Sequence, residues 1–127
     1  MTFPEDWPQG CPPEDARPTS GLVYRIVQTN PATTADFVTF AELGRFPRKP
    51  PDCPCMPVGL SVFESGDDAA WMARKHPYLG KFLASGVLSP TDGVIKPTKG
   101  QRPTHMTWWP PAGCDRVQPF TACEEVA

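Results

Sequence analysis

The sequence predicts an α+β fold: a single small domain with a mixed, strongly bent β-sheet, two short helices and proline-rich loops. Three observations support this prediction. The chain has 127 residues, a length that fits one domain. Its 18 prolines interrupt helices and remove backbone donors, so we expect short elements and many loops. The central block from Val58 to Lys96 reads as a strand, a capped helix and a strand, and its pattern, caps and breakers agree.

The chain divides into a proline-rich arm over residues 1–20, an α+β body over 21–109 and a tail over 110–127. The arm holds five prolines and four acidic residues but lacks periodic apolar residues. We expect such a segment to lie over the surface or to be mobile. Trp7 is the exception, and we expect it to dock into a groove on the body.

The first part of the body reads as a strand, a short helix and a connector. Leu22–Val27 has few polar positions, which indicates a central strand covered on both sides. Thr33 or Thr34 can cap a short helix that stops at Gly44. Phe46–Pro57 carries five prolines, so we expect neither a regular helix nor a central strand there.

The second part of the body begins with a strand over Val58–Phe63. Ser65 is a good N-cap for the helix that follows, and Asp68 stands in a capping-box-like position three residues later. Pro77 ends this helix. Further strands are expected over 81–88, 94–96 and 104–109, and Pro119 restricts a last strand, over 116–123, to a sheet edge.

Composition excludes several classes of protein. The net charge is −2 and the pI is about 5.6, so there is no electrostatic reason to expect nucleic-acid binding. No apolar run approaches the roughly 20 residues that span a bilayer. The N-terminus has acids and prolines where a signal peptide has basic residues and an apolar run, so we expect a cytoplasmic location. Five cysteines is an odd number, and reduced thiols are the simpler interpretation.

Arg25 and Ser61 are the first candidate binding residues, and both lie on predicted strands. A guanidinium fixed on a strand presents a planar fork suited to a phosphate or a carboxylate. The alternative is an exposed strand face, or an ion pair with an acid such as Glu42. The Ser61 hydroxyl could orient Arg25 or a ligand ribose, or it could be an ordinary outward-facing strand residue.

His105 is the candidate catalytic residue because a histidine beside aromatic rings suits acid–base chemistry or ligand binding. The alternative is a strand histidine satisfied by a backbone carbonyl. Trp108 and Trp109 follow it and must point to opposite faces of a strand. Either one is buried and the other is a partly exposed binding surface, or both are buried and the proline-rich arm covers the second.

Two other groups of residues, a cysteine pair and a possible catalytic triad, are weaker candidates for a functional site. Cys53 and Cys55 are separated by one residue, not by the two of common zinc and redox motifs, so no metal site is assigned. A zinc-stabilised domain would need the other cysteines to fold onto this pair. A Ser–His–Asp triad could be drawn from Ser61, His105 and Asp115, but no local motif supports an activated serine.

The order of these features resembles the ADP-ribosyltransferase fold over roughly residues 22–96. The segment Val23-Tyr24-Arg25-Ile26 is similar to a first strand whose arginine contacts NAD in that family. The strand 59–63 and the alanine-rich helix after it are similar to a strand that carries a serine before such a helix, and 82–88 resembles the next core strand. The resemblance implies that NAD is the cofactor and that Arg25 holds a phosphate. It also implies that Ser61 positions Arg25 or the ribose, and that Tyr24 or Phe63 stacks near nicotinamide.

The chain departs from that family in one important respect. The family places a glutamate near a late strand, whereas the late acids here are Asp115, Glu124 and Glu125, none in a recognisable motif. The resemblance therefore implies an inactive relative, a nucleotide binder, or an enzyme that uses His105 in place of the acid. The competing hypothesis is a non-enzymatic interaction module, such as an inhibitor, an immunity protein or an assembly subunit.

Overall fold

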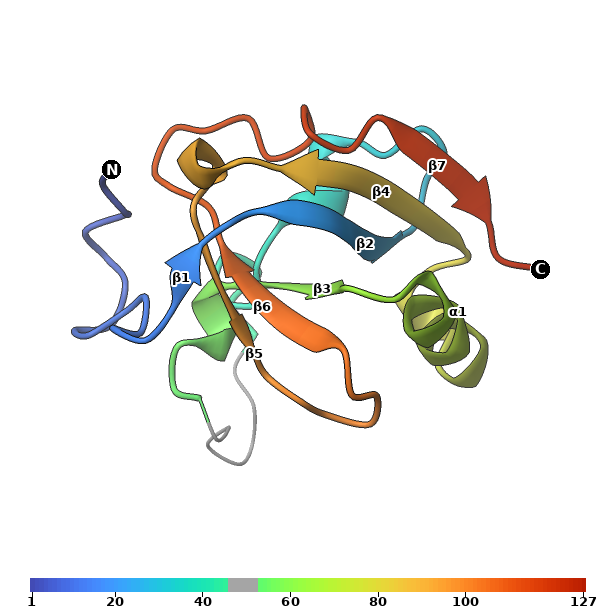
Figure 1. Ribbon diagram of the computed structural model, residues 1–127, viewed down its shortest axis with the longest axis horizontal. Helices are drawn as coiled ribbons and strands as arrows, with labels where there is room; N and C mark the ends of the chain where they lie inside the picture. Colours follow the sequence, from blue (N-terminus) through green and yellow to red (C-terminus); the bar gives the residue numbers. More distant parts are fainter. Residues whose placement is uncertain (46–52) are drawn as a thin grey trace.

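Seven strands form a single sheet in the order β1-β5-β6-β3-β2-β4-β7 in the computed structural model, which describes residues 1–45 and 53–127. Figure 1 shows the strands fanned out, with β7 beside β4 at one side and β5 beside β6 at the other. The strands are β1 (Arg17–Pro18), β2 (Gly21–Val27), β3 (Leu60–Phe63), β4 (Phe82–Leu88), β5 (Val94–Pro97), β6 (His105–Trp109) and β7 (Ala122–Glu125).

The α+β class is confirmed, but the prediction of a mixed sheet is wrong because every described strand pair is antiparallel. The cause is the position of β2. The strands β3 and β4, which precede and follow the helix, both flank β2 and run antiparallel to it. They are therefore parallel to each other without being neighbours.

The predicted second helix is also absent from the described residues. The segment forms a 3-10 turn, η1 (Thr34–Phe37), Val38 is extended, and residues 40–44 form a separate hydrogen-bonded turn that is not a helix. Two arginines explain the early stop. Arg25 donates to the carbonyl of Asp36 and Arg116 to that of Phe37, so side-chain donors satisfy these carbonyls where a longer helix would use backbone N–H groups. Tertiary contacts here override a local helical pattern.

The helix after β3 is confirmed as α1 (Gly66–Lys75), and it packs on β2, β3 and β4. Ser65 is its N-cap, and its hydroxyl accepts from the backbone N–H of Asp68 at 3.2 Å. Ala69 and Ala73 are buried on its inner face. It has ten residues, and no helix in the described part of the chain could cross a bilayer.

The two tryptophans of β6 lie on opposite faces, and both are fully buried. Trp108 belongs to the main core and packs against Phe120. Trp109 belongs to a second cluster with Cys53, Cys55 and Val58, against which the arm residues Phe3, Trp7, Cys11 and Ala16 pack. The interpretation in which the arm covers the second tryptophan is therefore confirmed, and a partly exposed tryptophan is ruled out.

The arm is held at several points. The strand β1 pairs with β5, and Trp7 stacks on Phe3 against the Trp109 cluster. Cys11 and Cys55 form a disulfide. The expectation of reduced thiols is thus wrong for this pair, because the arm folds back across 44 positions of sequence onto the body.

The connector and the tail complete the fold. The predicted connector Phe46–Pro57 lies partly outside the described residues. Its described end leads into a 3-10 turn, η2 (Met56–Val58), so β3 starts two residues later than expected. The edge strand of the tail is β7 rather than 116–123, because Phe120 turns inward to join the main core. Two further 3-10 turns are η3 (Pro77–Leu79) and η4 (Pro90–Asp92).

Candidate functional site

A groove of about 560 Å³ is open on the face of the sheet that α1 partly covers. Its floor comes from β3 and β6. Phe63 pairs with His105 and Ser61 pairs with Thr107, so strand alternation places all four side chains on one face. The walls come from the end of α1, from η3, from η2 and from residues 38–45. The groove therefore lies where two regular strands meet irregular, proline-rich segments.

Ser61 and His105 form a hydrogen-bonded pair on this floor. The Oγ of Ser61 lies 3.0 Å from Nε2 of His105, and Ser61 is exposed. On the other side of the ring, Nδ1 lies 2.7 Å from the carbonyl oxygen of Thr98. A carbonyl oxygen only accepts, so Nδ1 carries the proton in the neutral ring and Nε2 accepts from the Ser61 hydroxyl.

The imidazole of His105 is held by its neighbours. It meets the ring of Phe63 edge-on, with 5.2 Å between centroids. The hydroxyl of Thr98 lies 3.0 Å from Nδ1 and 2.8 Å from the hydroxyl of Thr107. Burial lowers the pKa of His105, and the hydrogen bond to Thr98 acts in the opposite direction. The ring is therefore neutral at pH 7, with its Nε2 lone pair facing the groove.

This lowered pKa predicts a loss of stability on acidification below about pH 6.5. There, His105 of the unfolded chain takes up a proton that the folded chain still excludes, so acid favours unfolding until the pH passes the folded pKa. Urea unfolding between about pH 7 and pH 5 measures this slope. His105→Gln should flatten it, whereas an equal slope in the variant would contradict the assignment.

Arg25 bridges β2 and β3 where their pairing ends. These strands pair only at Tyr24 and Phe63 in the described register. Beyond that point Arg25 donates from Nη1 to the carbonyl of Ser61 at 2.8 Å and from Nε to the carbonyl of Asp36 at 2.9 Å. Burial lowers the pKa of Arg25 to about 10, while the charge of Asp36 opposes this shift. The guanidinium therefore stays charged at pH 7.

The acids near Arg25 are engaged elsewhere. The carboxylate of Asp36 accepts from the backbone N–H groups of Gln28 and Thr33 and from Thr29. Burial alone would raise the pKa of Asp36, but these hydrogen bonds outweigh it and lower the pKa. Glu42, the ion-pair partner considered for Arg25, bonds to Arg116 at 2.7 Å instead.

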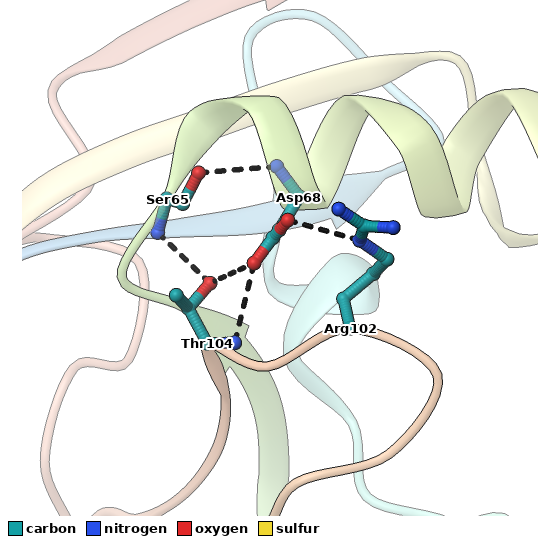
Figure 2. Close-up of polar contacts among 4 residues, drawn as sticks. All are labelled: Ser65, Asp68, Arg102 and Thr104. Atoms are coloured by element: carbon teal, nitrogen blue, oxygen red, sulfur yellow. Dashed lines mark hydrogen bonds and ion pairs between the residues drawn. The ribbon is translucent and has the colours of Figure 1, made fainter.

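The loop before His105 is fastened to α1 by Asp68 (Figure 2). The buried carboxylate of Asp68 accepts from the backbone N–H and the hydroxyl of Thr104, and from Nε of Arg102 at 3.0 Å. The hydroxyl of Thr104 also accepts from the backbone N–H of Ser65. The hydrogen bond from the Thr104 hydroxyl lowers the pKa of Asp68, and Arg102 adds to the effect. This network fixes the residue directly before His105.

The predicted site residues are brought together with one exception. Arg25, Ser61, Phe63 and His105 all line the groove. Tyr24 does not, because its ring lies under the start of α1, where a Cβ on Gly66 would approach it to 3.2 Å. This residue therefore supports the helix rather than the groove.

The described residues form neither the triad with Asp115 nor a zinc site on Cys53 and Cys55. Asp115 caps its own turn by accepting from the N–H groups of Val117 and Gln118, and it lines a different hollow. No three His, Cys, Asp or Glu side chains gather as a metal site in residues 1–45 and 53–127. A zinc site on Cys53 and Cys55 would require the Cys11–Cys55 disulfide to be broken.

Comparisons of the chain with known protein families, curated proteins and solved structures find no match. Any function for the groove is therefore inferred from its own residues.

Two contributors to the site were missed from the sequence. Thr98 could have been inferred by pairing the predicted strands 94–96 and 104–109 as a hairpin. In the observed register Pro97 pairs with Met106, which places Thr98 opposite His105. The wall around Cys55 had no such signal, because its partner Cys11 is 44 positions away in sequence.

Proposed function

We propose that the groove binds a nucleotide of the NAD type. The observation that carries this proposal is the convergence of Arg25, Ser61, Phe63 and His105 on one groove of about 560 Å³. These four residues come from three different strands, and the volume lies within the range of small-molecule sites. The resemblance to the ADP-ribosyltransferase fold assigns a role to each of them.

The groove residues fit the chemical parts of such a ligand. Arg25 brings a positive charge suited to a phosphate, although two of its donors already serve backbone carbonyls. Ser61 is exposed and suits a ribose hydroxyl. The lining also holds Phe40 and Tyr78, which are 57% and 75% exposed and offer ring faces for a base. When bound, NAD would supply an activated glycosidic bond.

The groove differs from an acid-dependent site. The late acids Glu124 and Glu125 lie on β7, which β4 and β2 separate from β3. Asp36 lines the groove, but its carboxylate is engaged by backbone N–H groups. The proposal therefore concerns binding first, with His105 as the residue that would take the place of the acid.

A titration of thermal unfolding with NAD tests this proposal. Ligand at 100 times its Kd adds about 2.7 kcal/mol of stability, which raises the midpoint by several degrees in a domain of this size. Ser61→Ala removes one hydrogen-bonding group and should weaken affinity by a factor of roughly 2 to 12.

Ser85→Ala is the matched control, because Ser85 is a half-buried serine on β4, opposite Ala122 and outside the groove lining. It should bind NAD like the unaltered chain. An unchanged midpoint at millimolar NAD would contradict the proposal.

The groove rim favours a second candidate, a protein-binding module. Phe40, Leu43 and Tyr78 line the groove and are more than half exposed. Apolar side chains gathered in this way are typical of interaction surfaces. Trp109, considered for this role from the sequence, is fully buried and is not part of such a surface.

The cytoplasmic location stays a prediction. Disulfides persist mainly in oxidising compartments, so the Cys11–Cys55 bond favours a location outside the reducing cytosol.

A further inference from the structure

Ser61 and His105 have the geometry of a nucleophile and its base, which nucleotide binding does not require. Covalent enzymes place a weak nucleophile within hydrogen-bond reach of a base, and a third group orients that base. Here the two distances are 3.0 Å from Ser61 Oγ to Nε2 and 2.7 Å from Nδ1 to the carbonyl oxygen of Thr98. We propose that Ser61 is a nucleophile toward carboxylic esters, with His105 as its general base and the Thr98 carbonyl in the orienting position.

The direction of the hydrogen bonds supports these roles. The Thr98 carbonyl fixes the proton on Nδ1, so the unprotonated Nε2 faces the Ser61 hydroxyl. In a serine hydrolase an aspartate fixes this tautomer; a backbone carbonyl does the same without a charge. The base is thus prepared to take a proton from Ser61 before any ligand arrives.

The pair rests on a rigid support and faces an open groove. Ser61 and His105 lie on paired strands, and the side chains of Thr98 and Thr107 are bonded beside the ring. The Asp68 network holds the loop that leads into β6. Sites on regular elements keep their geometry better than sites on loops. Ser61 itself is exposed, so a reacting atom can reach it.

The surroundings favour an ester with an apolar acyl group. The groove lining includes the apolar residues Ile26, Phe63 and Met72, and the ring of Phe63 contacts that of His105. Arg25 donates to the backbone carbonyl of Ser61 at 2.8 Å, so its positive charge lies next to the strand that carries the nucleophile. A positive charge near the reacting carbonyl would favour the negative oxygen that develops when the carbonyl is attacked.

The reaction balances without an external oxidant or metal. The Ser61 Oγ forms a bond to the ester carbonyl carbon while its proton passes to Nε2 of His105. The tetrahedral species then breaks its bond to the alcohol oxygen, which leaves with the proton from Nε2. Water attacks the acyl-serine by the same route, which releases the carboxylic acid and restores Ser61.

A fluorophosphonate probe tests the nucleophile directly. The serine oxygen bonds to phosphorus, fluoride leaves, and the serine proton leaves with it as hydrogen fluoride. We expect intact-mass analysis to show one adduct, mapped by peptide masses to Ser61. Ser61→Ala should remove the adduct, Ser85→Ala should retain it, and His105→Gln should slow labelling by about 100-fold or more.

Three results would overturn the proposal: no adduct, an adduct that maps to another residue, or equal labelling rates with and without His105. Mapping in the unaltered chain needs no variant, so the test stays decisive even if His105→Gln does not fold. Hydrolysis of p-nitrophenyl acetate and butyrate, lost in Ser61→Ala, is the second readout. Labelling detects a covalent bond and the NAD titration detects reversible binding, so either proposal can fail alone.

Discussion

Reduction of the Cys11–Cys55 disulfide is expected to lower the free energy of unfolding by about 4 kcal/mol, the chain-entropy value for a loop closed over a separation of 44 residues. A small domain is stable by only about 5–15 kcal/mol, so this loss is a large share of the total. It arises mainly in the unfolded state, where the reduced chain gains conformations that the crosslink forbids.

The folded state keeps other anchors for the arm. The strand β1 still pairs with β5, and the backbone N–H of Ala112 still donates to the carbonyl of Thr2. We therefore expect the reduced protein to fold, with a looser wall around Cys55. That wall continues into Met56 and Pro57, which line the groove, so reduction should also weaken binding there.

Urea unfolding with and without a reductant measures the effect, and the Cys11→Ser, Cys55→Ser double variant should reproduce it under non-reducing conditions. Cys123→Ser is the matched control because Cys123 is a free thiol on the edge strand. A denaturation midpoint that reductant leaves unchanged would contradict the prediction, as would an equal loss in the control.

The central block was predictable because its signals are local. Ser65 caps α1 and Pro77 follows its end. Outside the block, the alternation in β6 likewise places Trp108 and Trp109 on opposite faces. The predicted ends of the strands in this block lie within about two residues of the observed ends. Different methods of assigning secondary structure disagree by a similar amount. Each of these features depends on neighbours a few residues away.

The features that failed depend on distant residues. Where the second helix was expected, Arg25 from β2 and Arg116 from the tail bond the carbonyls at the end of η1. The sequence of the segment itself does not indicate these two contacts. The disulfide joins the arm to the connector, which no local pattern links.

For the site, the sequence joins Ser61 and His105 only in a triad with Asp115 that no local motif supports. The register of β3 against β6 brings Ser61 and His105 within hydrogen-bond reach, and the carbonyl of Thr98, not Asp115, bonds the other ring nitrogen.

Trp109→Ala is the second large effect, with an expected loss of about 3–5 kcal/mol of unfolding free energy. The side chain is fully buried, and truncation leaves a cavity in the small cluster between the sheet and the arm. The indole Nε1 also donates to the carbonyl of Cys55 at 2.9 Å, so that carbonyl would keep only its hydrogen bond from the backbone N–H of Val58. Both losses affect the segment around Cys55, which the disulfide to Cys11 also holds.

Trp109→Phe is the intermediate case, because it keeps a buried six-membered ring but removes the donor and part of the indole volume. It should cost about 1–3 kcal/mol, clearly less than the alanine variant. Val87→Ala, at a side chain that is 68% exposed, should change stability by no more than about 0.5 kcal/mol. If Trp109→Ala unfolded no more easily than Val87→Ala, the arm would not cover Trp109 in solution. Gly59 and Met56 line the groove and lie against the Trp109 cluster, so such a result would also mean that Trp109 does not support this wall of the groove.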